Sequence, residues 1–279
     1  MQNPQFLLFP DFKPKALTFS YDDGVKEDIR LVEIFRKNKL KATFNLNSYN
    51  LGKTFAGREI LSAEEALSLY GTDMEIAAHG ARHLTPTKTP TPLLARDILA
   101  DRTYLERLFH KIVRGYAYPA GKYNGETVEL VADLGFSYAR TVDATNSFAL
   151  PESWLALNPT CHHGSPELQS LIKRFTKPFK ETDPTYWISS PKLFYVWGHS
   201  YELSEKDNWE VVENFCEIMG RQKDVWFATN GEIYKYLEAF DRLIFSIDLS
   251  FVENPTSTDV YLKINGKKVV ATAKETTKL

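Results

Sequence analysis

The sequence has little cysteine, almost no net charge and no long apolar run, and each absence excludes a class of protein. The two cysteines, Cys161 and Cys216, form no CxxC pair, so we expect free thiols rather than a disulfide scaffold or a cysteine-rich metal site. The formal net charge of −2 offers no positive footprint for nucleic acid or an anionic membrane. No apolar stretch approaches the ~20 residues of a membrane span, and no signal peptide is visible after Met1. We therefore expect a soluble, cytoplasmic protein with no nucleic-acid or membrane partner.

The remaining composition is that of an ordinary globular chain. With 279 residues, 43% of them hydrophobic and 25% charged, the chain can form one large α/β domain or two small ones. Aromatic residues make up 13% of it. Most of them are expected to fill the core; the alternative is that some line a sugar-binding groove.

Apolar, β-rich runs alternate with helical patterns along most of the chain. Ala16–Tyr21 is a predicted strand, and an amphipathic helix is predicted over Val25–Asn38. Repeated strand–helix units imply parallel strands with crossover helices, and seven or eight of them imply a closed or nearly closed barrel. The fold class is therefore α/β, a distorted TIM-like (β/α) barrel. The further predicted strands are Ala42–Leu46, Met74–Ala78, Ile112–Tyr118, Phe136–Val142, Leu193–Trp197 and Val225–Ala228.

The pattern changes after Asp241, where alternation continues without helices. Strands are predicted at Leu243–Leu249 and Val260–Ile264, with a turn at Asn265-Gly266. We expect a barrel over residues 1–240 and a small β appendage over residues 241–279. Residues 143–192 show less regularity.

Three short motifs follow predicted strands: Tyr21-Asp22-Asp23-Gly24, His79-Gly80-Ala81-Arg82-His83 and Trp197-Gly198-His199. Together they supply two adjacent carboxylates, two imidazoles four residues apart and a third imidazole. A hydrolase needs this inventory to hold a divalent metal, activate water and protonate a leaving group. Singly, each motif has an ordinary explanation, such as a turn or a core histidine. Their placement at the carboxyl ends of strands, where barrel enzymes build their sites, favours the hydrolase.

On these motifs the chain resembles the polysaccharide deacetylase family, the NodB-homology hydrolases of carbohydrate esterase family four. The family's Thr-Phe-Asp-Asp-Gly motif is similar to residues 18–24, its His-Ser/Thr-x-x-His motif to residues 79–83, and its final strand ending in histidine to residues 194–199. The resemblance covers roughly residues 15–240. It implies a NodB-type barrel that removes acetyl groups from N- or O-acetylated sugars or oligosaccharides.

The resemblance also implies a role for each motif residue. Asp22 would be the general base and His199 the general acid. Asp23, His79 and His83 would be the metal ligands, which leaves open coordination positions as a catalytic site requires. Zinc is the first expectation for this donor set, with cobalt, nickel or manganese as alternatives.

Two departures from the family pattern stand out. Gly80 occupies a position where the family usually has Ser or Thr. Ala117 stands where the third motif has an arginine that normally pairs with the base aspartate. We predict that Arg140, on the next strand, supplies that guanidinium to Asp22; the alternative is a surface arginine. The usual Asp and Trp of the fourth motif are missing.

The third motif keeps Pro119 and Gly121. The backbone N–H of Ala120 would be the oxyanion donor, which tolerates a change of side chain. Tyr118 and Pro119 are the expected substrate contacts beside it.

Two further positions stay open. His162 and His163 are adjacent, which argues against both binding one metal; one reaches the site as a substrate contact or supporting partner, or both are ordinary loop residues. Glu202 either orients the ring of His199, in place of the missing fourth-motif aspartate, or is a solvated charge.

The sequence leaves three functions open. The first is deacetylation of an acetylated sugar. The second is hydrolysis of a carbon–nitrogen bond in a small non-sugar amide by the same fold. The third is a silent carbohydrate-binding relative, which has no need for all five motif carboxylates and imidazoles.

Overall fold

The computed structural model describes residues 7–71, 73–178 and 191–279. The N-terminal residues 1–6, on which the expectation about a signal peptide depends, and residues 179–190 of the less regular region lie outside this description. Across the described residues, no helix combines the length and the apolar character that crossing a membrane requires.

The centre of the molecule is an eight-stranded sheet in which every pairing is parallel. The strands follow the order β8-β7-β6-β3-β2-β10-β9, and β11 pairs with β2. The sheet curls into a half-barrel, which confirms the predicted distorted (β/α) barrel. Its strands are β2 (Lys15–Asp22), β3 (Thr43–Leu46), β6 (Glu75–Ala78), β7 (Gly115–Ala117), β8 (Tyr138–Arg140), β9 (Cys161–His162), β10 (Lys192–Gly198) and β11 (Val225–Phe227).

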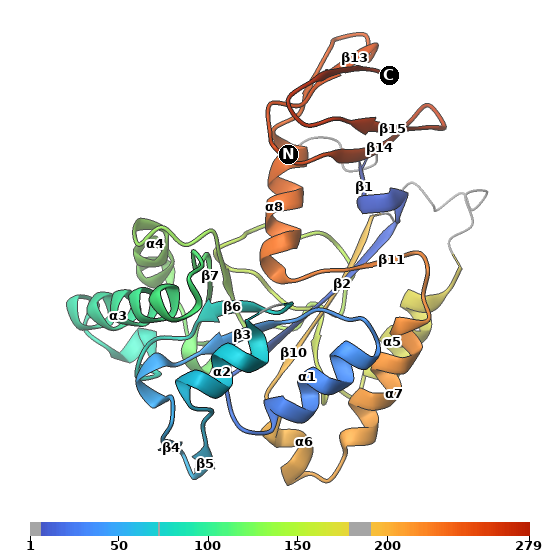
Figure 1. The fold of residues 1–279 in the computed structure, drawn as a ribbon. Coiled ribbons are helices and arrows are strands. Elements are labelled where there is room, and N and C mark those ends of the chain that lie inside the picture. The colour runs from blue at the N-terminus through green and yellow to red at the C-terminus, as the bar shows by residue number, and fades with distance from the viewer. Residues whose placement is uncertain (1–6, 72, 179–190) are drawn as a thin grey trace.

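Helices cover the outside of this sheet (Figure 1). Ser62 and Glu65 form a capping box at the start of α2 (Ala63–Tyr70), because each side chain accepts a hydrogen bond from the other's backbone N–H. The helix predicted over Val25–Asn38 begins later, at Asp28, and ends at Lys37. The helices are α1 (Asp28–Lys37), α2 (Ala63–Tyr70), α3 (Thr91–Phe109), α4 (Gly125–Asp133), α5 (Leu168–Thr176), α6 (Tyr201–Glu205), α7 (Trp209–Gly220) and α8 (Asn230–Asp241).

Only strands and loops follow α8 in the described chain, as the change of pattern predicted. One small sheet joins β1 (Leu7–Leu8), β14 (Val260–Ile264) and β15 (Lys267–Ala271), and another joins β12 (Ile244–Phe245), β13 (Phe251–Glu253) and β16 (Thr276–Lys278). The pairing of β1 with β14 was not predicted. A second apolar core unites these strands with α8 and with the amino ends of β2 and β10. The appendage therefore lies at the end of the sheet opposite the motif residues.

The sequence analysis missed a hairpin made of β4 (Thr54–Phe55) and β5 (Arg58–Glu59). Its strands have two residues each, too few for alternation to be visible. Of the predicted strand Phe136–Val142, only Tyr138–Arg140 forms a strand, β8, which pairs with β7. On its other side, residues 154–157 form hydrogen bonds with Ala139 and a bridge with Arg140.

Candidate active site

The predicted site residues share the carboxyl rim of the sheet. Asp22 is the last residue of β2 and Asp23 follows it, His79 follows β6, and His199 follows β10. Since all these strands run parallel, their carboxyl ends meet at one rim, so the motifs come together although they are far apart in sequence.

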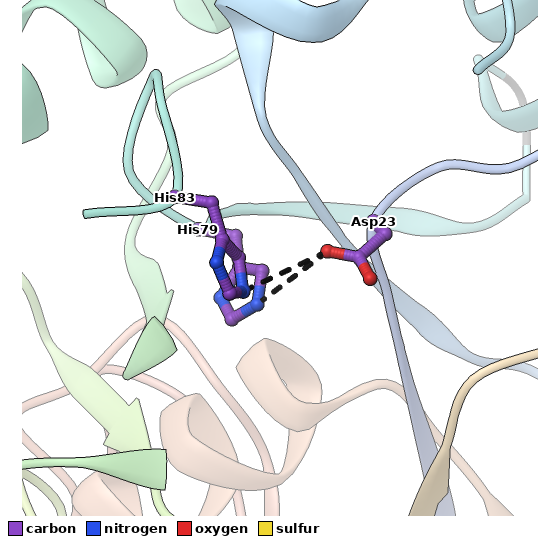
Figure 2. A group of neighbouring side chains, drawn as sticks. All are labelled: Asp23, His79 and His83. Atoms are coloured by element: carbon purple, nitrogen blue, oxygen red, sulfur yellow. Dashed lines mark ion pairs between the residues drawn. The ribbon is translucent and has the colours of Figure 1, made fainter. Parts of the chain in front are cut away.

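Asp23, His79 and His83 converge on one point (Figure 2). Asp23 Oδ1 lies 3.8 Å from His79 Nε2 and 3.9 Å from His83 Nε2. This oxygen is buried and has no hydrogen-bond partner among the residues that the structure describes. Asp23 and His83 both have positive φ angles, 79° and 55°, and such backbone strain in non-glycine residues gathers at functional sites.

The tautomer of His79 fits metal binding. Its Nδ1–H donates to the carbonyl oxygen of Ala117 at 2.8 Å, so the Nε2 lone pair faces Asp23. Burial lowers the pKa of His79 to about 4, which keeps the ring neutral. One carboxylate and two imidazoles with an orphaned carboxylate oxygen are a donor set that fits a divalent cation.

The loop that carries the two histidines requires glycine at position 80. Gly80 has a φ of +73°, and a Cβ there would approach Asp97 Oδ2 to 3.2 Å. Asp97 accepts from the backbone and side chain of Arg82, and Asp101 accepts from the backbone N–H of His79 at 3.0 Å. Asp97 and Asp101 of α3 therefore hold the loop by hydrogen bonds. In the family pattern, position 80 of this loop is a serine or threonine.

Arg140 contacts Asp22, as the sequence analysis expected. Its side chain is fully buried, and Nη2 donates to Asp22 Oδ1 at 2.6 Å and to Oδ2 at 2.5 Å. Burial alone would raise the pKa of Asp22, but the charge of Arg140, with smaller contributions from His79 and His199, outweighs it and lowers the pKa to about 2. Ala117 and Arg140 are direct partners in the register of β7 and β8, so the guanidinium comes from the strand beside the one that lacks it.

Asn45 is a site residue that the sequence analysis missed. Its Nδ2 donates to Asp22 Oδ1 at 2.7 Å and to Ser20 Oγ at 2.8 Å, and it pairs with Asp22 in the register of β2 and β3. Polar residues at alternate positions of a buried strand, here Thr43 and Asn45, were the available indication of an inward polar face.

His199 lies between Asp22 and Glu202. Its Nε2 is 3.7 Å from Asp22 Oδ2, and its Nδ1–H donates to Glu202 Oε1 at 2.8 Å. Burial would lower the pKa of His199, but the hydrogen bond to Glu202 and the charge of Asp22 outweigh it and raise the pKa above its usual value. Glu202 and Asp22 therefore favour the protonated form of the imidazole.

Glu202 collects two further imidazoles. His162 Nε2 lies 3.3 Å and His163 Nε2 3.7 Å from its carboxylate oxygens. Both rings reach Glu202, because Gly198 leaves space for that of His163: a Cβ there would meet the ring at 2.2 Å. His163 also contacts the hydroxyl of Tyr21 at 3.1 Å.

The tautomer of His162 decides what this second cluster can do. His162 Nδ1 accepts from the N–H of Gly164 at 3.0 Å, so its Nε2 carries the proton and donates to Glu202. The ligand atoms of His162, His163 and Glu202 lie within 4.8 Å of one another, but a protonated Nε2 cannot bind a cation. The cluster is a hydrogen-bond network around Glu202, and these bonds hold the pKa of its carboxyl well below the usual value although burial opposes them.

The third motif contributes mainly backbone. Tyr118 is 1% exposed, and its hydroxyl donates to the carbonyl oxygen of Leu155, so this side chain is not free to contact a substrate. Pro119 is buried, whereas Ala120 is exposed and has a φ of 54°.

Comparison with known proteins points to the same family as the motifs. The family model described as polysaccharide deacetylase matches residues 10–139, which confirms the resemblance that the motifs predicted. A curated relative from Bacillus subtilis (strain 168), "Putative polysaccharide deacetylase YxkH", is 26% identical over 141 residues. That match covers 49% of this chain and 49% of the relative, so the chain spans about half the length of the relative.

Two solved structures share the fold over most of the chain. A "putative polysaccharide deacetylase from Mycobacterium smegmatis" aligns with a TM-score of 0.59 and 18% identity over 85% of this chain and 94% of its own. A structure described as "Puue Allantoinase" aligns with a TM-score of 0.58 and 14% identity over 84% of this chain and 93% of its own. At these identities the similarity establishes the fold alone.

Proposed function

We propose that this protein is a metal-dependent hydrolase that removes an acetyl group from an N- or O-acetylated sugar or oligosaccharide. Asp23, His79 and His83 would hold the cation, with zinc expected and cobalt, nickel or manganese as alternatives. A divalent cation bound there would act as a Lewis acid toward the acyl carbonyl and make water a better nucleophile near neutral pH.

The chain's own residues supply the proton transfers. Asp22 stays ionised beside Arg140, so it accepts the proton of the attacking water. His199, whose protonated form Glu202 and Asp22 favour, would give its proton to the departing amine or alkoxide, so that water and the acyl compound become an acid and an amine or alcohol. The N–H of Ala120 would donate to the oxyanion that develops on the carbonyl.

Glu202 supports this division of labour. Its carboxylate accepts the Nδ1–H of His199, which fixes the ring with Nε2 toward Asp22. His162 in turn donates to Glu202, so both act through His199 as positioning residues rather than by touching the substrate.

One observation carries the proposal: a buried, unpartnered carboxylate oxygen of Asp23 faces two imidazoles next to an Asp22 that Arg140 keeps charged. A buried oxygen atom without a hydrogen-bond partner destabilises the fold. A protein that only binds carbohydrate would gain nothing from this oxygen, whereas a metal site requires it.

The test combines metal content with acetate release. Elemental analysis of the purified wild type is expected to find close to one divalent cation per chain, and His83→Ala is expected to lose it. Acetate release from N-acetylglucosamine oligomers is expected from the wild type and not from Asp22→Asn reconstituted with the same metal. Metal-loaded wild type that releases no acetate from any acetylated sugar would contradict the proposal.

The second candidate is hydrolysis of a small non-sugar amide. The allantoinase-named structure supports it, since the same fold over most of both chains is compatible with that type of substrate. Conversion of allantoin to its ring-opened carboxylic acid, measured beside the acetate assay, separates the two candidates.

A further inference from the structure

The β4–β5 hairpin and the start of α6 form one row of side chains between the candidate metal ligands and the candidate acid. The Phe55 ring lies 5.8 Å from the His83 ring, and Phe55 pairs with Arg58 across the hairpin. The Arg58 guanidinium lies 3.6 Å from the Tyr201 ring centre. Tyr201 in turn lies 5.0 Å from the ring of His199. We call Phe55, Arg58 and Tyr201 the hairpin wall.

An ion pair fastens the hairpin to α6. Arg58 Nε and Nη2 both donate to Glu205 Oε1, at 3.1 and 2.7 Å, while the same guanidinium stacks on Tyr201. A planar guanidinium that makes two hydrogen bonds and a ring contact has few other conformations available. The β4–β5 hairpin and α6 are therefore held together, although Arg58 and Glu205 are about 150 residues apart in sequence.

The base of the hairpin is fixed to the segment that follows Asp23. Lys26 N–H donates to the carbonyl oxygen of Glu59, Leu61 N–H donates to that of Gly24, and Val25 forms a bridge with Ile60. Held at its base and its tip, the hairpin wall has a defined position relative to the candidate ligands.

We propose that the hairpin wall makes this a chain-end or short-substrate hydrolase, an inference that rests on the proposed function. A polymer that is deacetylated at internal units must extend past the reacting group in both directions. The half-buried rings of Phe55 and Tyr201 lie beside His83 and His199 on one side of the candidate site, and in this proposal they close that side to a longer chain. The substrate class is therefore a single acetylated sugar or the terminal unit of a short oligosaccharide, with Phe55 and Tyr201 as the specificity-determining residues.

The test locates the deacetylated unit. The metal-loaded wild type is incubated with the N-acetylglucosamine tetramer, and the products are sequenced by mass spectrometry. A terminal unit is expected to react in about tenfold or greater excess over the internal units, the discrimination that a few excluded contacts provide. Equal reaction at internal and terminal units would overturn the inference and leave the proposed function standing.

Releasing the hairpin is expected to relax this preference. Arg58→Ala removes the ion pair and the ring contact together, and the terminal excess is expected to fall by about fivefold, the effect of losing one exposed ion pair with its ring contact. Glu205→Gln removes the ion pair alone and is expected to give a smaller fall. Amide hydrogen exchange across residues 53–60 is expected to accelerate in Arg58→Ala.

Arg30→Ala is the matched control. Arg30 also combines an ion pair, to Glu213 at 2.9 Å, with a ring contact, to Trp209 at 4.4 Å, but it joins α1 to α7 away from the hairpin. It is expected to leave the terminal excess unchanged. Faster exchange in the hairpin without any change in the site of reaction, or unchanged exchange in Arg58→Ala, would each contradict the inference. Release from no acetylated sugar would instead overturn the proposed function, and the inference with it.

Discussion

Asp22 and Arg140 form a buried ion pair, so the stability of each depends on the other. We expect Arg140→Met to lower the free energy of unfolding by about 3–5 kcal/mol, because it leaves a buried carboxylate without its counter-ion. Urea denaturation of the metal-free protein at pH 7 measures this.

The double variant Asp22→Asn/Arg140→Met is the control for that measurement. It removes both charges and is expected to recover much of the loss, since the cost lies in the unpaired charge rather than in the missing contact. A single variant within about 1 kcal/mol of the wild type would contradict the coupling.

Asp28 titrates in an unusual range. It is buried, it accepts from Tyr70 and Ser200, and burial outweighs these bonds to raise its pKa from 3.8 to about 7. Because the folded pKa lies above the unfolded one, its contribution is most favourable below pH 4 and diminishes as the pH rises to about 7.

Asp28→Asn should remove this dependence. Its free energy of unfolding minus that of the wild type is expected to increase between pH 4 and pH 7 and then level off, by at most about 4 kcal/mol for a shift of this size. Denaturation midpoints at several pH values measure it, and Asp11→Asn, at an exposed carboxylate, is the control. A difference that is constant with pH would contradict the shift.

At the scale of elements, the loop between β6 and α3 positions two candidate ligands. Gly80→Ala must place a Cβ beside Asp97 in a backbone region that L-residues avoid. We expect zinc affinity to fall by about 10–100-fold, the effect of disturbing residues that orient metal ligands. Isothermal titration with zinc measures this, and Gly57→Ala, also at positive φ but with no atom near its Cβ, is the control. Equal affinities for the two variants would contradict the role of Asp97.

At the scale of the whole molecule, Tyr236 joins α8 to the appendage. Its hydroxyl donates to the carbonyl oxygen of Leu8 at 2.6 Å and accepts from the N–H of Tyr261 at 2.9 Å. Tyr236→Phe leaves both backbone groups without this partner, and we expect a loss of about 1–3 kcal/mol. Thermal unfolding measures it, while metal content should not change because the site lies at the opposite end of the sheet.

The barrel and the convergence of Asp23, His79 and His83 were predictable because both depend on local sequence patterns. Strand–helix alternation fixes the parallel sheet, and a parallel sheet brings Asp23, His79 and His83 to one rim. Even the contact between Arg140 and Asp22 followed from comparing neighbouring strands. These residues are near strand ends, where sequence position translates directly into place.

The rest depends on contacts that no local pattern records. His163 reaches Glu202 only because Gly198 leaves room for its ring. The Tyr118 hydroxyl is occupied by a hydrogen bond to the carbonyl oxygen of Leu155, which lies 37 residues further along the chain. The β4–β5 hairpin has strands too short to show a period, and its position depends on Glu205, far along the chain.

The register between Ala117 and Arg140 has a consequence for how relatives of this chain are recognised. Asp22 is paired with one guanidinium, and here that guanidinium comes from β8 rather than from the paired position on β7. A motif search that requires arginine at the β7 position will miss chains that carry it at the paired position of β8, as this chain does. Scoring the two paired positions jointly, as a single column of the barrel, would retain them.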